Sequence, residues 1–445
     1  MFESVGESCG VIALRGVAGA AGALACHGLV ALQHRGQESA GVVVAGAGGL
    51  SRQCGHGLVQ QVFEGLTPAL PECGAALGHV RYATAGGSGA GNVQPLLGQT
   101  RRGDEFALAH NGHLLRVAGH DGWAPGTGAA DTATLAAAVG AEPGGVRDAL
   151  LAVLPKVEGA YSIAVLDGET VHAARDPYGF RPLCLGRLAG GGWVVASESA
   201  ALECLGARYL REVEPGELVT LDGHGLRGER FAAASPAGCV FEYVYFARAD
   251  SMLGGVRVHQ ARHAMGVALA GEAPVEADVV VAVPDSGRPA ALGYASASGL
   301  YYAEALARNA YAGRTFLQPS TVERRRAVRL KFGVLPELVA DRRVVMVDDS
   351  LVRANSARDL VSLVRAAGAR EVHLRIASPP VRWPCFFGVD LPTRAELAAG
   401  RRGIREVAEL VRADSLGYLS VEAMVAACGP APKCVGCFTG TYPTG

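Results

Sequence analysis

Cys9, close to the start of the chain, is the first residue whose type and place suggest chemistry. Only a thiolate attacks well, and a free thiol with a pKa of about 8.5 needs a base to form it. Removal of residues 1–8 would leave the α-amino group of Cys9 beside its own thiol, and the pKa of about 8 of such a group suits a base. Taken alone, however, a single cysteine is more often an ordinary buried residue.

Two adjacent carboxylates, Asp348 and Asp349, follow the apolar run VVMV at residues 344–347. A polar loop comes next, and a helix is expected to begin near Ser356. Ligands of open α/β sheets bind at the carboxyl ends of the strands, and a helix N-terminus suits a phosphate. The acidic pair can meet sugar hydroxyls or hold Mg²⁺. The other interpretation is a pair of Asp residues that cap a surface turn.

A second segment, VVVAVPDSGRPAA at residues 279–291, repeats this strand–turn–helix pattern with Ser286 and Gly287 at the turn. Two such turns on one sheet predict a ligand with two phosphate groups and magnesium between them. The basic run at residues 314–332 can close over such an anion. A charge run is more often a solvated helix face.

A C-x-x-C pair, Cys434 and Cys437, lies near the other end of the chain. Such a pair is consistent with zinc, with half of an iron–sulfur site or with a redox couple. The redox interpretation is weak, because no strand-to-helix thioredoxin context surrounds the pair. A metal site needs two further thiolates.

The composition limits the setting of these residues. The chain has 445 residues, of which 49% are hydrophobic and 19% charged, with a net charge of −1. This predicts two globular domains and gives no electrostatic case for nucleic acid or acidic lipid as a partner. The sequence has no apolar run of membrane-spanning length and no secretory signal at its start, so a cytoplasmic protein without disulfides is expected.

The two halves differ in their pattern of elements. The first half has short apolar runs bounded by glycine, which predict strands, and two helical stretches; this favours stacked sheets covered by helices. The second half alternates strands and helices, which favours a parallel α/β sheet. The boundary is expected within residues 222–238. The expected helices are 17–34, 131–154 and 356–367, and the expected strands are 10–16, 39–46, 161–168, 170–176, 193–199, 278–285, 343–350 and 371–378.

The second half resembles the type I phosphoribosyltransferases, which share an apolar strand, two acidic residues and a phosphate-binding loop. More narrowly, VPDSGRPAALGYA, NAYAGRTFLQP and VDDSLVR are similar to segments of the glutamine phosphoribosylpyrophosphate amidotransferase family. The resemblance implies a magnesium site at Ser286, Asp348 and Asp349. It also implies that the phosphosugar is bound by Arg353, Ser356 and Lys331.

One position departs from the family pattern. The family loop has Gly and then Thr where this chain has Ala354 and Ser356. Ser356 keeps a hydroxyl, but a backbone that approaches phosphate often needs a positive φ, which glycine adopts without strain. Weaker or altered binding of the 5′-phosphate is therefore expected at Ala354.

The first half is similar to the N-terminal-nucleophile glutamine amidotransferases, with LQHRGQESAG, GHVRYATAG, NVQP, AHNGHL and ADT in the family order and RDPYGFRPL and ASES after them. The resemblance implies that Cys9 attacks the side-chain amide of glutamine. Arg81 would bind the α-carboxylate of glutamine and Asp131 its α-ammonium group. The Asn111 amide and the Gly112 N–H would form the oxyanion hole. Taken singly, H-N-G is also an ordinary turn and Asp131-Thr132 an ordinary helix cap.

The family branch with a propeptide also carries a [4Fe–4S] cluster. Its cysteines lie in the contexts CVFEY, PCFFG and C-x-x-CF, which are matched by Cys239, Cys385, Cys434 and Cys437. Zinc on the same four sulfurs is the alternative. The other cysteines, including Cys428, match no ligand position and are expected to be small buried hydrophobic residues.

Together these features imply a two-domain α/β and α+β protein. Residues 1–8 would be a propeptide, residues 9–235 an αββα N-terminal-nucleophile hydrolase sandwich with glutaminase activity, and residues 236–445 a type I phosphoribosyltransferase parallel sheet with a cysteine-bearing tail. Ammonia from glutamine would displace pyrophosphate from Mg²⁺-bound phosphoribosylpyrophosphate. The loop at 309–333 would close over the sugar.

The resemblance further implies feedback by purine nucleotides and a homotetramer, with no nucleic-acid or membrane partner. Two alternatives remain open. One is a related amidotransferase that acts on a different phosphosugar, as the segment Ala354–Ala357 suggests. The other is a nucleotide sensor without catalytic activity, against which the intact set of Cys9, Arg81, Asn111 and Asp131 argues.

Overall fold

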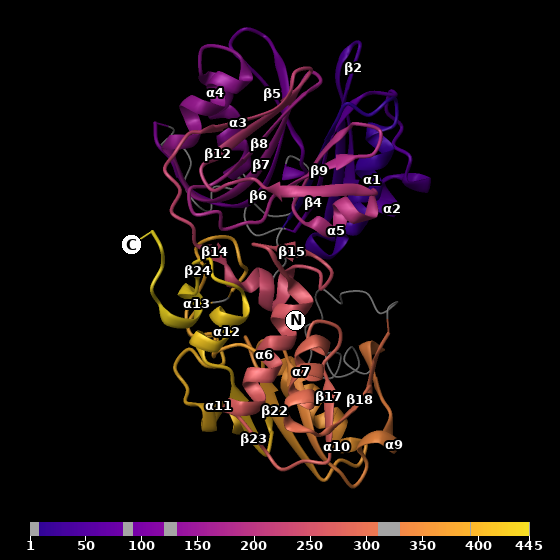
Figure 1. Ribbon diagram of the computed structural model, residues 1–445, viewed down its shortest axis with the longest axis vertical. Helices are drawn as coiled ribbons and strands as arrows, with labels where there is room; N and C mark the ends of the chain where they lie inside the picture. Colours follow the sequence, from indigo (N-terminus) through magenta and orange to yellow (C-terminus); the bar gives the residue numbers. More distant parts are fainter. Residues whose placement is uncertain (1–8, 83–91, 120–130, 310–329, 392, 445) are drawn as a thin grey trace.

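The computed structural model describes residues 9–82, 92–119, 131–309, 330–391 and 393–444. It has an upper part built on two sheets and a lower part built on one sheet with helices on both faces (Figure 1). The expected propeptide, residues 1–8, lies outside the described residues.

The first sheet of the upper part contains β1 (Gly10–Arg15), β2 (Ser39–Gly46), β3 (Gly49–His56), β4 (Ala75–Arg81), β9 (Cys184–Leu188), β10 (Trp193–Ala196) and β11 (Ala207–Glu212). Their order is β11-β9-β10-β1-β4-β2-β3, and each neighbouring pair is antiparallel. The strand that follows Cys9 thus lies near the middle of the sheet.

The second sheet contains β5 (Leu96–Gln99), β6 (Glu105–Val117), β7 (Val157–Asp167), β8 (Thr170–Arg175), β12 (Glu217–Asp222) and β13 (Gly225–Arg230). Their order is β13-β12-β8-β7-β6-β5, and all pairs are again antiparallel. The strand β6 carries the sequence AHNGHL.

Strand alternation divides the side chains of β1 between two layers. Val11 and Ala13 pack between the two sheets, whereas Ile12 and Leu14 pack on the other face. There they meet α1 (Ala21–Ala31) and α5 (Ser199–Cys204), near the short helix α2 (Val59–Val62). The helices α3 (Asp131–Ala141) and α4 (Val146–Val153) cover the second sheet. The expected αββα sandwich is confirmed.

The lower part has the expected parallel sheet. It contains β17 (Val279–Ala282), β18 (Tyr301–Ala303), β21 (Arg343–Asp348), β22 (Glu371–Ile376) and β23 (Ser415–Tyr418), in the order β18-β17-β21-β22-β23. One face packs against α6 (Val258–Glu272), α7 (Arg288–Ser298) and α12 (Val421–Ala427). The other face packs against α9 (Pro336–Val339), α10 (Asn355–Ala366) and α11 (Ile404–Val411).

Short elements complete the lower part. They are β14 (Gly238–Cys239) paired with β24 (Lys433–Cys434), β15 (Met252–Leu253) with β16 (Val256–Arg257), β19 (Leu306–Arg308) with β20 (Phe332–Val334), and the helix α13 (Gly436–Thr439). Among the described residues, no helix is both long and apolar enough to cross a membrane.

Two sequence predictions need correction. The helix expected over 131–154 is divided into α3 and α4, because Pro143 and Gly144, with φ of +116°, interrupt it. The helix expected over 17–34 is the shorter α1, followed by a 3₁₀ turn at Gln33–Arg35. The apolar run 239–246, to which no element was assigned, forms a π-helical turn at Glu242–Phe246 after Cys239.

Close packing of α6 on α7 generates a stability prediction. A Cβ atom added to Gly266 would lie 1.9 Å from the carbonyl oxygen of Ala290. Gly266→Ala should therefore lower the free energy of unfolding by about 1–3 kcal/mol, as overpacking does. Gly271 on the same helix has no atom within 4 Å of such a Cβ. Gly271→Ala is the matched control and should raise stability by up to about 1 kcal/mol. Urea midpoints measure both, and a Gly266→Ala protein as stable as the wild type would contradict the packing.

Candidate active site

Cys9 lies directly before β1, where that strand meets the end of β4. Its Sγ is 3.6 Å from the carbonyl oxygen of Tyr82, and Gly10 pairs with Val80. Burial raises the pKa of the Cys9 thiol, and the nearby Arg81 guanidinium offsets part of this rise. A thiol in this setting stays protonated at neutral pH and needs a base to become a nucleophile.

Asn111 and Gly112 are neighbours in the middle of β6. The Asn111 side chain is fully buried, and within the described residues neither its Oδ1 nor its Nδ2 has a hydrogen-bond partner. Leaving a buried polar group unpaired costs about 1–3 kcal/mol, so this amide is available to a ligand. Gly112 has φ of +150°, and a Cβ there would lie 2.0 Å from the carbonyl oxygen of Ala160. Only glycine fits at this position.

Asp131 and Arg81 are both buried charged groups near Cys9. Asp131 begins α3, and its carboxylate accepts hydrogen bonds from the N–H groups of Leu114 at 2.9 Å and Thr132 at 2.8 Å. Arg81 ends β4 and forms an ion pair of 3.0 Å with Glu38. The charges of Arg81 and Asp131 both act on the Cys9 thiol. The structure thus brings Cys9, Arg81 and Asp131 together, while residues 83–91 and 120–130 lie outside the described residues.

Glu38, the partner of Arg81, lies in the LQHRGQESAG segment, but no functional role was predicted for it from the sequence. For the segments RDPYGFRPL and ASES, likewise, no structural or catalytic role was predicted. The Ser197 hydroxyl of ASES accepts a hydrogen bond of 2.9 Å from the N–H of Val11 in β1. The Asp176 carboxylate of RDPYGFRPL accepts from the N–H of Tyr161 at 3.0 Å and of Tyr178 at 2.9 Å. Both segments therefore hold the backbone around the site.

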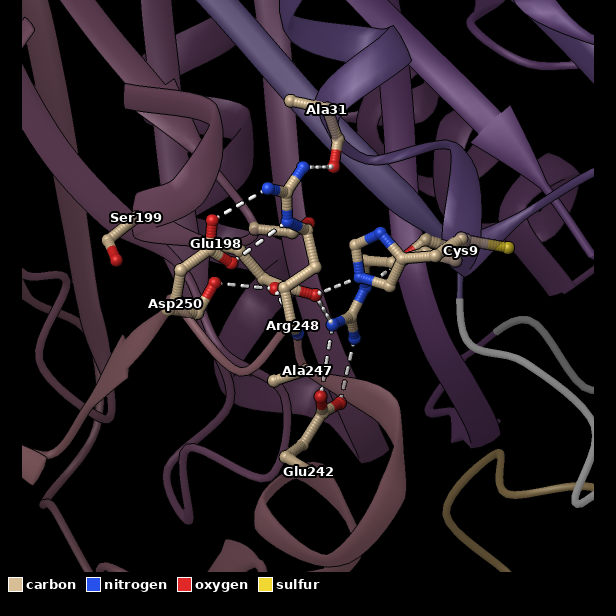
Figure 2. A network of polar contacts seen from close by, with 12 residues as sticks. Cys9, Ala31, Glu198, Ser199, Glu242, Ala247, Arg248 and Asp250 are labelled. Carbon is tan, nitrogen blue, oxygen red and sulfur yellow. Dashed lines mark hydrogen bonds and ion pairs between the residues drawn. The ribbon is translucent and has the colours of Figure 1, made fainter. Parts of the chain in front are cut away.

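A buried ionic network near Cys9 was missed as well (Figure 2). Its centre is Glu198, a fully buried carboxylate from ASES. Glu198 accepts hydrogen bonds from His34 Nε2 at 2.7 Å, the Arg248 N–H at 2.9 Å and the Ser251 hydroxyl at 2.7 Å. It also pairs with Arg35. The charged residues of this network lie inside motifs that the sequence analysis named, such as LQHRGQESAG and ASES. The order of the motifs along the chain does not reveal which charged side chains form ion pairs.

A second group lies at the carboxyl ends of β17 and β21. The Asp349 carboxylate accepts hydrogen bonds from the hydroxyls of Ser286 and Ser350, the latter at 2.5 Å. Burial raises the pKa of Asp348 well above its usual range, and the adjacent Asp349 carboxylate adds to this effect. Burial raises the pKa of Asp349 too. Two neighbouring carboxylates in this setting repel each other, and a divalent cation would stabilise their charged forms.

The residues expected to bind the phosphosugar come from segments next to α10 and β20. Arg353 lies in the turn before α10, and its guanidinium is 4.0 Å from the Glu396 carboxylate. Ser356 is partly buried in the first turn of α10. Lys331, next to β20, is close enough to act electrostatically on Asp348. Residues 310–329, which include most of the loop expected to close over the sugar, lie outside the described residues.

The departure at Ala354 has a structural counterpart. Ala354 has φ of +47° and ψ of −19°, which is the left-handed conformation. An L-residue with a Cβ pays about 1–2 kcal/mol in this conformation, whereas glycine does not. The Ala354 methyl is buried among the side chains under α10. The turn therefore keeps a backbone geometry that favours glycine, although the chain has alanine there.

Three of the four cysteines expected to bind a cluster lie in or next to the paired strands β14 and β24. Cys239 and Cys434 are register partners in these strands, and Cys437 follows in α13. Burial raises the pKa values of Cys239 and Cys437, and Cys385 contributes to both rises. Thiolates are the donor type that an iron–sulfur cluster or a structural zinc ion takes. Within the described ranges, however, no three His, Cys, Asp or Glu side chains are grouped as ligands of one metal ion.

The remaining cysteines are free, and the sequence prediction for them is partly wrong. Cys26, Cys73, Cys184 and Cys428 are buried as expected, whereas Cys54 and Cys204 are exposed. Both exposed residues lie near surface ends of elements, Cys54 in the edge strand β3 and Cys204 at the end of α5.

Comparison with known proteins gives consistent matches. A family model described as a glutamine amidotransferase domain matches residues 79–204. The amidophosphoribosyltransferase of Mycobacterium tuberculosis is 47% identical, over 99% of this chain and 87% of that protein. The amidophosphoribosyltransferase of Bacillus subtilis is 41% identical, over 100% of this chain and 95% of its own.

A solved structure extends the likeness to the fold. The glutamine phosphoribosylpyrophosphate amidotransferase from B. subtilis, complexed with ADP and GMP, matches with a TM-score of 0.90 and 40% identity. The match covers 98% of this chain and 97% of that one.

Proposed function

The chain belongs to the amidophosphoribosyltransferase family, and we propose from this how its own residues carry out the reaction. Members of the family are glutamine-dependent glycosyltransferases, and this chain is one of them. Phosphoribosylpyrophosphate, glutamine and water give 5-phosphoribosylamine, glutamate and pyrophosphate. This is the first step of purine synthesis.

Cys9 is the proposed nucleophile of the glutaminase half-reaction. After residues 1–8 are removed, the α-amino group of Cys9 takes the proton of the thiol, directly or through water. The thiolate attacks the side-chain carbonyl carbon of glutamine, ammonia leaves, and water hydrolyses the thioester. Arg81 holds the α-carboxylate of glutamine and Asp131 its α-ammonium group.

The observation that carries this proposal is the Asn111 side chain, which is fully buried and has no hydrogen-bond partner in the part of the chain that the structure describes. An amide held in this way next to the nucleophile strand gains a partner when a tetrahedral oxyanion forms. Together with the Gly112 N–H it stabilises charge that exists only during reaction, which is how oxyanion holes accelerate acyl transfer.

The second half-reaction takes place at the carboxyl ends of β17 and β21. We assign Ser286, Asp348 and Asp349 to Mg²⁺, and Arg353, Ser356 and Lys331 to the phosphosugar. When bound, Mg²⁺ neutralises the pyrophosphate leaving group. The N-terminus of α10 presents free N–H groups to the 5′-phosphate. The chain's own part is thus to orient the sugar and exclude water while ammonia attacks the anomeric carbon.

The four cysteines Cys239, Cys385, Cys434 and Cys437 are proposed to hold a [4Fe–4S] cluster, with zinc as the alternative. Two observations support a shared site: Cys239 and Cys437 are removed from water, and the neighbouring thiols act electrostatically on the pKa of each. Because β14 and β24 are far apart in sequence, a group bound there would fasten the C-terminal tail to the start of the lower part. Its role would be structural.

The remaining assignments are also proposals. The glutaminase domain is residues 9–235 and the phosphoribosyltransferase domain residues 236–445. The complex of the B. subtilis relative with ADP and GMP supports purine nucleotides as ligands of this chain. A homotetramer and a cytoplasmic location rest on the family resemblance and the sequence alone.

Replacement of the nucleophile tests the proposed division of labour. In Cys9→Ala, pyrophosphate release driven by glutamine should fall by about 10³-fold or more, because no thioester can form. Release driven by ammonium salt should stay within about twofold of the wild type, since ammonia then needs no glutaminase step. Mass spectrometry of the wild type first establishes whether the chain begins at Cys9. Loss of both rates would contradict the assignment.

The cluster is tested by metal analysis of protein purified without oxygen. We expect iron and acid-labile sulfide with broad visible absorption, which oxygen bleaches. Cys437→Ser should lose the iron, whereas Cys428→Ala, a buried cysteine outside the proposed ligand set, should keep it. Zinc in place of iron, or equal iron content in both variants, would contradict the proposed [4Fe–4S] cluster.

The left-handed turn gives a prediction for the phosphosugar. Ala354→Gly lets the turn adjust around a bound phosphate without the cost of about 1 kcal/mol that a Cβ imposes there, so the KM for phosphoribosylpyrophosphate should fall about three- to tenfold with little change in kcat. Asp341 has a similar φ of +57° at the opposite end of β21. Asp341→Gly is the matched control and should leave that KM unchanged. An unaltered or higher KM in Ala354→Gly would instead favour a different phosphosugar as substrate.

A further inference from the structure

Arg35 is a fully buried guanidinium that contacts both parts of the chain. Its Nε donates a hydrogen bond of 3.1 Å to the carbonyl oxygen of Cys9. Its Nη1 pairs with Glu198, and its Nη2 donates to Glu242 Oε1 at 2.8 Å. Glu198 belongs to the upper part, whereas Glu242 lies in the π-helical turn that begins the lower part. In Figure 2, Glu198 and Glu242 lie on different sides of the centre of the network.

This arrangement costs more than a surface ion pair. Arg35 and Glu198 are 0–1% exposed and Glu242 is 2% exposed, so three charges have left water. Burial opposes the charged guanidinium, but Glu242 and Glu198 outweigh it and raise the pKa of Arg35. Buried ion groups add little to stability compared with a well-packed apolar core, although removal of one partner is costly. A positional role explains why they are kept.

Glu242 is itself held in place from two sides. Arg181 Nη1 donates to Glu242 Oε1 at 3.2 Å. Arg262 of α6, also buried, donates to the carbonyl oxygens of Tyr243 at 2.7 Å and Ala247 at 2.8 Å. These contacts fix the π-helical turn and therefore the direction of the Glu242 carboxylate. Single π-helical turns are frequent at functional sites.

The contact with the Cys9 carbonyl sets the orientation of the residue that precedes β1. From Gly10 onward the backbone is fixed by pairing with β4 and β10. The carbonyl of Cys9 receives its hydrogen bond from Arg35 instead. The peptide that joins Cys9 to Gly10 is planar, so holding its carbonyl helps to fix the position of the Cys9 Cα, from which the thiol and the amino group branch.

We infer that Arg35 and Glu242 are positioning residues for Cys9, so that the lower part supplies a group without which the glutaminase site is incomplete. The inference rests on the proposed role of Cys9 as nucleophile. Glu242 acts through Arg35: it accepts a hydrogen bond from the Arg35 guanidinium, which in turn donates one to the carbonyl oxygen of Cys9. Errors of about 1 Å in such placement reduce rates about a hundredfold.

The test is the pair of rates in the full-length enzyme with Glu242→Gln, which keeps the size of the side chain but removes its charge. Glutamine-driven pyrophosphate release should fall at least about tenfold, while ammonium-driven release stays within about twofold. Alkylation of Cys9 by iodoacetamide, followed by mass spectrometry, should slow as well. Glu217→Gln is the matched control, because Glu217 is a buried carboxylate paired with Arg211, outside the contacts of Cys9; both rates should stay unchanged.

A second variant keeps the test decisive if Glu242→Gln folds poorly. Arg35→Lys retains the positive charge but cannot bind one carbonyl and two carboxylates together, and it should give the same split between the two rates. A parallel fall of both rates in both variants, or an unchanged glutamine-driven rate, would overturn the inference. Failure of the proposed function is distinguishable, since the wild type would then lack glutamine-driven turnover or keep it after alkylation of Cys9.

Discussion

Burial of charge is the constraint on which the rest of this structure depends. A charged group that leaves water must find a partner, and around Cys9 the partners come from both parts of the chain. Arg35 has one carboxylate from the upper part and one from the lower part. The two parts can therefore satisfy these charges only in one relative placement. That placement is also the one in which the backbone of Cys9 is held.

Around this ionic centre, small side chains let the layers come close enough to carry the sites. In the upper part, alanines of β1, β6 and β7 allow the two sheets to pack face to face, which brings β6 with Asn111 near β1. In the lower part, Gly266 and Gly293 allow α6 and α7 to approach backbone to backbone. This closeness places Arg262 of α6 within the electrostatic reach of Asp349. Packing and charge thus position both candidate sites.

Features set by local patterns were predictable from the sequence, and features set by distant partners were not. The runs at 279–282 and 344–347 are apolar on both faces, so they indicated a parallel sheet covered on both sides. The break between α3 and α4 depends on Pro143 and Gly144, a local signal that was overlooked. By contrast, Glu198 and Glu242 are 163 and 207 residues away from Arg35 along the chain. No periodicity of the sequence encodes such a contact.

Several of the places where the chain departs from ordinary rules lie at the two candidate sites. Asn111 is a buried amide that has no hydrogen-bond partner among the residues described, and Gly112 adopts a φ of +150° inside a strand. Asp348 and Asp349 are adjacent carboxylates in a buried setting, and Ala354 takes a conformation that suits glycine. Each feature lowers the free energy of unfolding of the ligand-free protein. Each also provides an interaction for a ligand: the amide for an oxyanion, the carboxylates for a cation and the turn for a phosphate. Because stable folds tolerate such features only where the surroundings enforce them, their coincidence with these turns favours a catalytic role over a merely structural one.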